Sequence, residues 1–330
     1  MYGINKILNF KKEKTMAIVK PSAMDFSNKN VIMIISGLPG TGKTTLALSA
    51  PDVLLIDADE GLARVAPAHR KDASICKTFE EVKADVTAAK GQYKTIVVDT
   101  GGALVDMLKQ HVIDHPDDYS GGSKKSGGIS QQGFGYVKQL FLDFSADLRK
   151  NFNVVYIFHE TKSKNGESIF YDLVCEGSAK TLVYQPADLA AHLFIMNNRR
   201  MLGFTPTEEY TAKSAYGIRG VMAIPELKDG DRNDFLTKLF EKIRENLKAE
   251  TASLAPQQDA YNKIMADAPG MMEAITDAET ANQFAGVLNT MEHALTSKKE
   301  LGAMYKARCK DLGLTWDTKV KAWVAGDAKQ

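Results

Sequence analysis

Residues 37–44 read GLPGTGKT, and this segment constrains the fold more than any other part of the chain. It matches G-x-x-x-x-G-K-[ST] in full, a pattern in which a glycine-rich loop joins a buried strand to a helix. The flanking residues fit, because the run VIMIIS (31–36) precedes the loop and TTLALSA follows it, up to Pro51. The sequence therefore predicts a strand, a phosphate-binding turn and a helix, which is a building block of α/β sheets.

Each part of this loop has a predicted role in binding a nucleoside triphosphate. Glycines permit backbone turns that residues with a Cβ avoid, so successive N–H groups can converge on phosphates at the positive end of a helix. Lys43 is expected to reach the β and γ phosphates, and the Thr44 hydroxyl is expected to bind Mg²⁺. The predicted nucleotide contacts are Gly37, Leu38, Pro39, Gly40, Thr41, Gly42, Lys43, Thr44 and Thr45.

Six short runs predict the strands of the sheet. Four of them are apolar almost throughout, as in strands that are buried on both faces. Amphipathic stretches separate the runs, which is typical of a mostly parallel, doubly wound α/β sheet flanked by helices. The runs cover residues 31–36, 53–57, 95–99, 154–158, 189–196 and 220–224.

The 330 residues are expected to divide into three parts. A flexible arm over 1–25 precedes an α/β core over 26–245, and a small helical extension covers 246–330. Met16 is an alternative start to Met1.

The helical extension is predicted from an Ala-rich composition that follows a break at Ala255–Pro256. The S/T-x-x-E/Q pattern at Thr280 and at Ser297 predicts helices that start near 281 and 298. Apolar residues at helical spacing are expected to form the buried faces of these two helices: Phe284, Val287, Leu288, Met291 and Leu295 on the first, and Leu301, Met304, Tyr305 and Leu312 on the second.

Asp99 is the predicted second half of the magnesium site. It ends the run TIVVD, so it should lie at the carboxyl edge of the sheet, where open α/β sheets bind ligands. There it is expected to hold Mg²⁺ through water. The sequence has no Asn-Lys-x-Asp stretch for reading guanine, so ATP is the expected nucleotide.

Hydrolysis needs a base that orients and deprotonates water, and the acidic cluster of Asp57, Asp59 and Glu60 supplies the candidates. Glu60 is preferred, because its side chain is longer and Gly61 frees the backbone behind it; Asp59 is the alternative. His159 ends the strand VVYIF, where a polar side chain could sense the γ phosphate. A structural histidine without a catalytic role is the other interpretation of His159.

Together these segments resemble the RecA-like ATPase core, in particular the phage nucleotide-binding proteins of the RecA-like single-strand annealing type. The likeness rests on 37–44, IDADEG (56–61), the strand that ends at Asp99 and a polar residue that ends the next strand, and it covers about 25–225. It implies a DNA-stimulated ATPase that acts in phage recombination in the cytoplasm of the bacterial host. It also implies a ring or filament of identical subunits, single-stranded DNA as partner and a single-strand DNA-binding protein as a further partner.

The RecA-like resemblance implies two mobile DNA-binding loops, one after the strand that carries Asp99 and one after the next strand. The Gly- and Ser-rich stretch within 114–135 fits the first, as loop 117–133, and 160–180 fits the second; an Asn165–Gly166 turn within it suggests a hairpin. A few cations among flexible residues suit contact with a nucleic-acid backbone. The candidate DNA contacts are Lys124, Lys125, Lys162, Lys164 and Lys180.

RecA-like ATPases also complete their site with cations from a neighbouring subunit. The resemblance assigns this trans-acting role to Lys213 and Arg219, with Arg199 and Arg200 as alternatives. The sequence departs from the usual K-x-R form here, because Lys213 is followed by Ser214 and Ala215.

The composition limits the remaining possibilities. The formal net charge is +1, so any contact with DNA must rest on local cations. Three cysteines lie far apart in the sequence, which excludes a disulfide framework and favours a reducing cytoplasm, and no apolar run is long enough to span a membrane.

The sequence leaves two other functions open. A small-molecule kinase would use 114–135 as a lid, although kinase lids usually carry arginines and this segment has none. A non-catalytic ATP switch or loader would use the C-terminal helices as a docking surface.

Overall fold

The computed structural model describes residues 26, 28–124, 126–165, 168–175, 179–228 and 230–326. It divides the chain into two compact units, Ser27–Leu247 and a second unit that contains Lys248 onward. The predicted boundary at residue 245 lies close to this division. The predicted arm over 1–25 lies outside the described residues.

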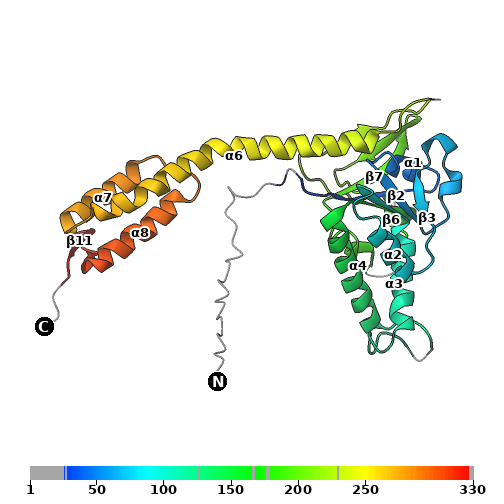
Figure 1. The fold of residues 1–330 in the computed structure, drawn as a ribbon, viewed down its shortest axis with the longest axis horizontal. Helices are drawn as coiled ribbons and strands as arrows, with labels where there is room; N and C mark the ends of the chain where they lie inside the picture. Colours follow the sequence, from blue (N-terminus) through cyan, green and yellow to red (C-terminus); the bar gives the residue numbers. More distant parts are fainter. Residues whose placement is uncertain are drawn as a thin grey trace, which may run out of the picture. The chain divides into compact units, whose positions relative to one another are not determined.

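One sheet of nine strands forms the centre of the described part of the first unit (Figure 1). The strands are parallel in the order β3-β2-β4-β5-β1-β7, whereas β8, β9 and β6 are added antiparallel. This confirms the predicted α/β P-loop fold with a mostly parallel sheet. The strands are β1 (Ile32–Gly37), β2 (Val53–Asp57), β3 (Asp72–Ser74), β4 (Thr95–Asp99), β5 (Asn153–Asn165), β6 (Ser168–Leu173), β7 (Leu189–Met196), β8 (Arg199–Gly203) and β9 (Val221–Ala223).

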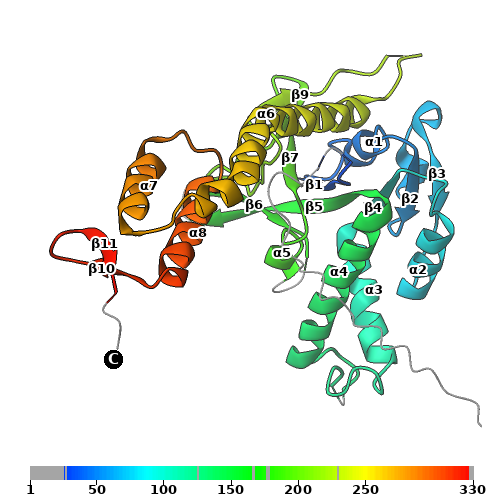
Figure 2. The same ribbon diagram turned by 60° about the vertical axis from the view of Figure 1, so that its left-hand side comes forward.

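Helices cover both faces of this sheet (Figure 2). An apolar cluster lies on each face of the sheet, and alternate residues of β1 enter different clusters. Ile32 and Ile34 pack into the first cluster, whereas Met33 and Ile35 pack into the second. Helices α2, α3 and α4 close the first cluster, and α1 and the first turns of α6 close the second. The helices are α1 (Lys43–Ala47), α2 (Phe79–Ala88), α3 (Gly101–Asp114), α4 (Gln131–Asn151), α5 (Ala179–Leu182) and α6 (Phe235–Glu273), with short 3-10 helices η2 (Leu62–Arg64) and η3 (Pro67–His69).

The strand register brings the ends of β1, β2 and β4 together with His159, which lies within β5, at one edge of the sheet. Gly37, the last residue of β1, lies beside His159 of β5, and Asp57 at the end of β2 lies beside Asp99 at the end of β4. Because parallel strands share their carboxyl ends, residues far apart in sequence meet here. This edge holds the candidate site.

The Gly- and Ser-rich stretch is shorter and better packed than expected. Helix α3 ends at Asp114 and α4 begins at Gln131, where the Ser130 hydroxyl accepts a hydrogen bond of 2.9 Å from the Gly133 N–H. The prediction of a mobile loop over 117–133 is therefore wrong for 131–133, which belong to α4, and Tyr119 packs against the core.

Most of the second expected loop is a β-hairpin. Strands β5 and β6 pair antiparallel from Glu160↔Leu173 to Asn165↔Ser168, which confirms the predicted hairpin and corrects the view of 160–180 as a mobile loop. Residues 166–167 and 176–178 lie outside the described part.

In the second unit, the predicted break at Ala255–Pro256 is wrong, because α6 continues through Pro256 and Pro269 to Glu273. A proline inside a helix costs about 3 kcal/mol. Burial of Tyr261, Ala268 and Met272 on the later turns of α6 offsets this cost.

Two more helices and a hairpin complete the second unit: α7 (Ala278–Thr290), α8 (Ser297–Asp311), β10 (Leu314–Asp317) and β11 (Ala322–Ala325). The predicted start near 281 is a few residues late for α7, because Asp277 caps this helix by accepting a 2.8 Å hydrogen bond from the Thr280 N–H. The predicted start near 298 is confirmed for α8, which begins at Ser297 with Thr296 as its N-cap. Val287 and Leu295 of the predicted apolar face are exposed, whereas Phe284 and Leu288 pack against the core of this unit.

None of the helices in the described ranges combines the length and the apolar character that crossing a membrane requires.

Candidate nucleotide-binding site

The loop after β1 has the backbone shape that its glycines predict. Gly40 and Gly42 have φ angles of 79° and 92°, in the left-handed region that other residues rarely adopt. At Gly37 the constraint is space, because a Cβ there would lie 2.5 Å from the carbonyl oxygen of Leu193 on the neighbouring strand β7. The loop therefore requires glycine at these positions for local physical reasons.

Lys43 begins α1 and lies inside the curve of the loop. Its Nζ donates hydrogen bonds of 3.0 Å to the carbonyl oxygens of Gly37 and Leu38, and the side chain is buried. Burial lowers the pKa of Lys43, and the nearby charges of Asp99, Glu160 and Asp59 oppose this effect. Phosphate oxygens at this position would supply the negative charge that a buried ammonium group needs.

Thr44 and Asp99 come together as predicted for a magnesium site. The Thr44 hydroxyl donates a hydrogen bond of 2.6 Å to Oδ2 of Asp99, which is 3% exposed. Burial raises the pKa of Asp99, while the bond from Thr44 lowers it. A hydroxyl and a carboxylate beside a phosphate-binding loop form the set of hard oxygen ligands that Mg²⁺ prefers, so the residues present fit this ion.

The turn after β2 is held by Asp57 and by β4. One carboxylate oxygen of Asp57 accepts the Gly61 N–H at 2.7 Å and the other accepts the Leu62 N–H at 3.0 Å. The N–H groups of Ala58 and Asp59 donate to the carbonyl oxygen of Asp99, at 2.7 and 3.1 Å. Asp57 is thus occupied in shaping the turn, and the turn fixes where the next two carboxylates lie.

Those two carboxylates, Asp59 and Glu60, lie in different places. Asp59 lines a cavity of about 460 Å³, whereas Glu60 lines a separate cavity beside α3. The sequence favoured Glu60 as the residue that faces the nucleotide loop, but in the structure Asp59 faces it. Glu60 has a positive φ of 50°, and its exposed side chain lies away from this cavity. The residues that line the cavity of Asp59 are Pro39, Gly40, Gly42, Lys43, Thr44, Thr45, Gly61, Arg64, Val65, Asp99, His159 and Arg200.

His159 faces Asp59 across this cavity. Its Nε2 lies 3.6 Å from Oδ2 of Asp59, and about a third of the side chain is exposed. Its Nδ1 is buried and has no hydrogen-bond partner among the described residues. The placement fits a γ-phosphate sensor, while the unpartnered Nδ1 does not fit a fully satisfied structural histidine.

Two arginines contribute cations to this cavity in the same chain. Arg200, on β8, lies so close that a Cβ on Gly42 would be 3.2 Å from its Nε. Sequence reasoning considered Arg200 only for a trans-acting role, since the addition of β8 beside β7 is not visible in the local pattern. It missed Arg64, whose Nη2 donates to Oδ2 of Asp59 at 3.1 Å.

The other predicted cations lie away from this cavity. Lys162 and Lys164 are on β5 within the hairpin, and Lys124 lies in the connection between α3 and α4, while Lys125 and the side chain of Lys180 fall outside the described part. Lys213 donates to the carbonyl oxygen of Ala187 in its own chain, and Arg219 is exposed. The trans-acting role of Lys213 and Arg219 stays a prediction.

Comparison with known proteins agrees with this geometry. Residues 29–216, more than half of the chain, match the family described as AAA domain. No curated protein matches the chain. The matched range includes the loop over 37–44, Asp59, Asp99 and His159, so the chain belongs to the AAA domain family of P-loop ATPases.

Proposed function

We propose that this protein hydrolyses ATP with Asp59 as the carboxylate that orients and deprotonates the attacking water, and that it does so in phage DNA recombination or single-strand annealing. One observation supports the catalytic part above all. Asp59, Asp99 and His159 line the same cavity as Lys43 and Thr44 of the phosphate-binding loop. This is the set of charges that phosphoryl transfer to water requires.

Each group has a defined task in this proposal. Lys43 and the loop N–H groups bind the phosphates, and Thr44 with Asp99 holds Mg²⁺, which neutralises charge on the β and γ phosphates when bound. Asp59 accepts a proton from water, and the hydrogen bond of 3.1 Å from Arg64 orients its carboxylate. Arg200, which lies beside Gly42, stabilises negative charge that develops on the phosphoryl oxygens.

The hairpin of β5 and β6 is the proposed DNA contact. Lys162 and Lys164 are two residues apart on one strand, so their side chains leave the same face of the hairpin. The hairpin begins at Glu160, directly after His159 in the nucleotide cavity. A change at the γ phosphate can therefore reach the DNA contact along a single strand, which would link hydrolysis to DNA.

The structure weakens the support for a small-molecule kinase. That function needs 114–135 to close over the nucleotide, and no described residue of this stretch lines the nucleotide cavity. A non-catalytic switch would bind ATP without turning it over, so a direct measurement of hydrolysis separates it from the proposal.

Phosphate release with and without a single-stranded oligonucleotide tests the proposal. Wild type should hydrolyse ATP with Mg²⁺, and single-stranded DNA should raise the rate. Lys43→Ala should abolish hydrolysis both with and without DNA. Hydrolysis that DNA does not change, together with no DNA binding at low salt, would reject the recombination role and leave the ATPase assignment in place.

The hairpin contact is tested by Lys162→Ala combined with Lys164→Ala. The matched control is Lys298→Ala combined with Lys299→Ala, since these two lysines are exposed on α8 of the second unit. The hairpin variant should bind DNA more weakly and with a flatter salt dependence, while it keeps basal ATP hydrolysis. Equal DNA affinity for the two double variants would move the DNA contact elsewhere.

A further inference from the structure

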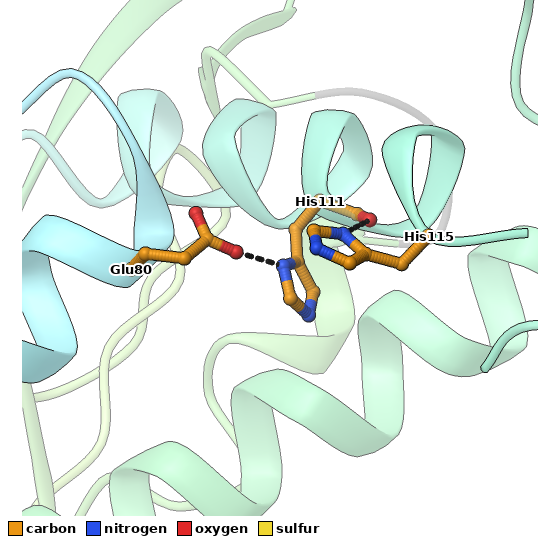
Figure 3. Close-up of side chains that lie close together, drawn as sticks. All are labelled: Glu80, His111 and His115. Carbon is orange, nitrogen blue, oxygen red and sulfur yellow. Dashed lines mark hydrogen bonds and ion pairs between the residues drawn. The ribbon is translucent and has the colours of Figure 1, made fainter.

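Two histidines and a glutamate meet on the surface of the first unit, beside α2 and the last turn of α3 (Figure 3). Glu80 comes from the first turn of α2, His111 comes from the last turn of α3, and His115 is the C-cap of α3. One ligand atom from each of the three side chains lies within 4.8 Å of the other two. None of the three lines the nucleotide cavity, so the cluster is separate from the site described above.

Helical geometry explains why the two imidazoles are neighbours. Residues four apart lie on the same face of a helix, and this spacing of two histidines recurs in zinc sites on helices. The ring centroids of His111 and His115 are 4.4 Å apart. Capping of α2 by Thr78 fixes the first turn of that helix, which brings the Glu80 carboxylate to Nδ1 of His111.

The hydrogen bonds of the two rings indicate which nitrogens can bind a cation. Nδ1 of His115 donates to the carbonyl oxygen of His111 at 2.8 Å, so its lone pair is on Nε2. Nε2 of His111 is 3.0 Å from the Tyr119 hydroxyl, while Nδ1 faces the Glu80 carboxylate. A bond from one ring nitrogen to a carbonyl or hydroxyl oxygen is the usual support for a metal-binding histidine.

The contact between His111 and Glu80 requires a proton or a cation between the ring nitrogen and the carboxylate oxygen. A neutral ring with its proton on Nε2 would present a lone pair to a carboxylate oxygen, which is repulsive. Either a proton on Nδ1 or a bound cation resolves this repulsion. A divalent cation also engages His115, which a proton on His111 does not.

We propose that Glu80, His111 and His115 form a binding site for a borderline transition-metal cation of the Zn²⁺ type, which joins α2 to the end of α3. Two imidazole nitrogens and one carboxylate oxygen are the ligands of many three-residue zinc sites, in which water completes the tetrahedron. Ligands of Zn²⁺ lie about 2.0–2.2 Å from the ion, so they are roughly 3.3 Å apart. Glu80 can make this adjustment because its side chain is 53% exposed.

Such a cation would stabilise the connection between α3 and α4. His115 is the C-cap of α3, directly after Asp114, and Tyr119 in the connection is within hydrogen-bond distance of His111. Binding of the ion to the folded chain would therefore hold the end of α3 and the first residues of the connection in place. The predicted DNA contact Lys124 lies in the same connection, so occupancy of this site would bear on its position.

Titration of tag-free protein with Zn²⁺ against a chromophoric chelator tests the site. Wild type should bind one equivalent, and His111→Ala and His115→Ala should each weaken that binding by about tenfold or more. His293→Ala is the matched control, since this histidine lies in the second unit and its loss should leave the affinity unchanged. Equal affinity for wild type, His111→Ala and His115→Ala would overturn the proposal, as would no saturable binding by wild type.

Two further measurements keep the test valid if an alanine variant folds poorly. Glu80→Gln changes one exposed side chain without loss of volume, and it should weaken Zn²⁺ binding while the circular dichroism spectrum stays the same. Bound Co²⁺ should give the absorption of nitrogen and oxygen ligands; a thiolate charge-transfer band would assign the metal to a cysteine and reject this site. Lys43→Ala should bind Zn²⁺ normally, so failure of the ATPase proposal would not affect this result.

Discussion

The Asp57 carboxylate should stabilise the nucleotide site more than its place outside the cavity suggests. It is 2% exposed and accepts the Gly61 N–H at 2.7 Å and the Leu62 N–H at 3.0 Å. Asp57→Asn keeps the shape of the side chain and one oxygen acceptor. It turns an NH₂ group toward the second N–H, so one buried donor loses its partner.

The magnitude follows from these contacts. A hydrogen bond to a charged group contributes about 1.5–3 kcal/mol, and one of the two is lost. We expect Asp57→Asn to lower the free energy of unfolding by about 2 kcal/mol, which corresponds to roughly 4–8 °C in Tm for a unit of this size. Because the same turn positions Asp59, ATP hydrolysis should fall as well, while ATP binding persists.

Asp52→Asn at the other end of β2 is the matched control. Asp52 pairs with Lys94 at 2.8 Å, but its side chain is 57% exposed, so its loss should cost under about 1 kcal/mol. Thermal unfolding by circular dichroism compares the two variants with wild type. Tryptophan emission follows the unfolding of the second unit separately, because Trp316 and Trp323 both lie in that unit. Equal Tm values for Asp57→Asn and Asp52→Asn would refute the structural role of Asp57.

Three further predictions concern packing, charge and nucleotide affinity. In a denaturation assay, Gly101→Ala should destabilise the first unit by about 1–3 kcal/mol, because its Cβ would lie 2.3 Å from the Phe158 ring. Gly286→Ala is the control: this residue lies in α7 with open space around it, so the substitution should be stabilising in the same assay. Asp99→Asn should raise Tm at neutral pH and abolish hydrolysis. Burial raises the pKa of Asp99, so the charged form of this side chain destabilises the fold. The free energy of unfolding of the wild type should therefore fall as the pH rises from 3.8, the pKa of Asp99 in the unfolded chain, through its raised pKa in the folded chain. Arg200→Ala should weaken ATP binding in calorimetry by about 10- to 100-fold through loss of one charge-assisted contact; unchanged affinity would exclude a contact with the nucleotide.

Features that depend on neighbouring residues could be predicted from the sequence. The loop over 37–44 needs its glycines and Lys43 at fixed spacing, and the strands that end at Asp57 and Asp99 are short runs of β-forming residues. The parallel order of such strands then follows from the α/β alternation. These local signals were sufficient to predict the fold and, within the candidate site, the phosphate-binding loop and Asp99.

Features set by long-range contacts could not be predicted. Whether Asp59 or Glu60 faces the cavity depends on the turn that Asp57 and β4 hold, and this turn has no distinct pattern in the sequence. Arg200 reaches Gly42 only because β8 is added antiparallel beside β7. Helix α6 continues through Pro256 because its later turns are buried, and this burial outweighs the low helix propensity of proline.

The central claim is that Asp59 activates water in a P-loop ATPase site, and the steady-state rate of ATP hydrolysis tests it in two variants. At saturating ATP and Mg²⁺, Asp59→Asn should lower kcat by about 10²–10⁴ while it still binds ATP, and Glu60→Gln should stay within a factor of about 2 of wild type. Loss of hydrolysis in Glu60→Gln with near-normal turnover in Asp59→Asn would contradict the account.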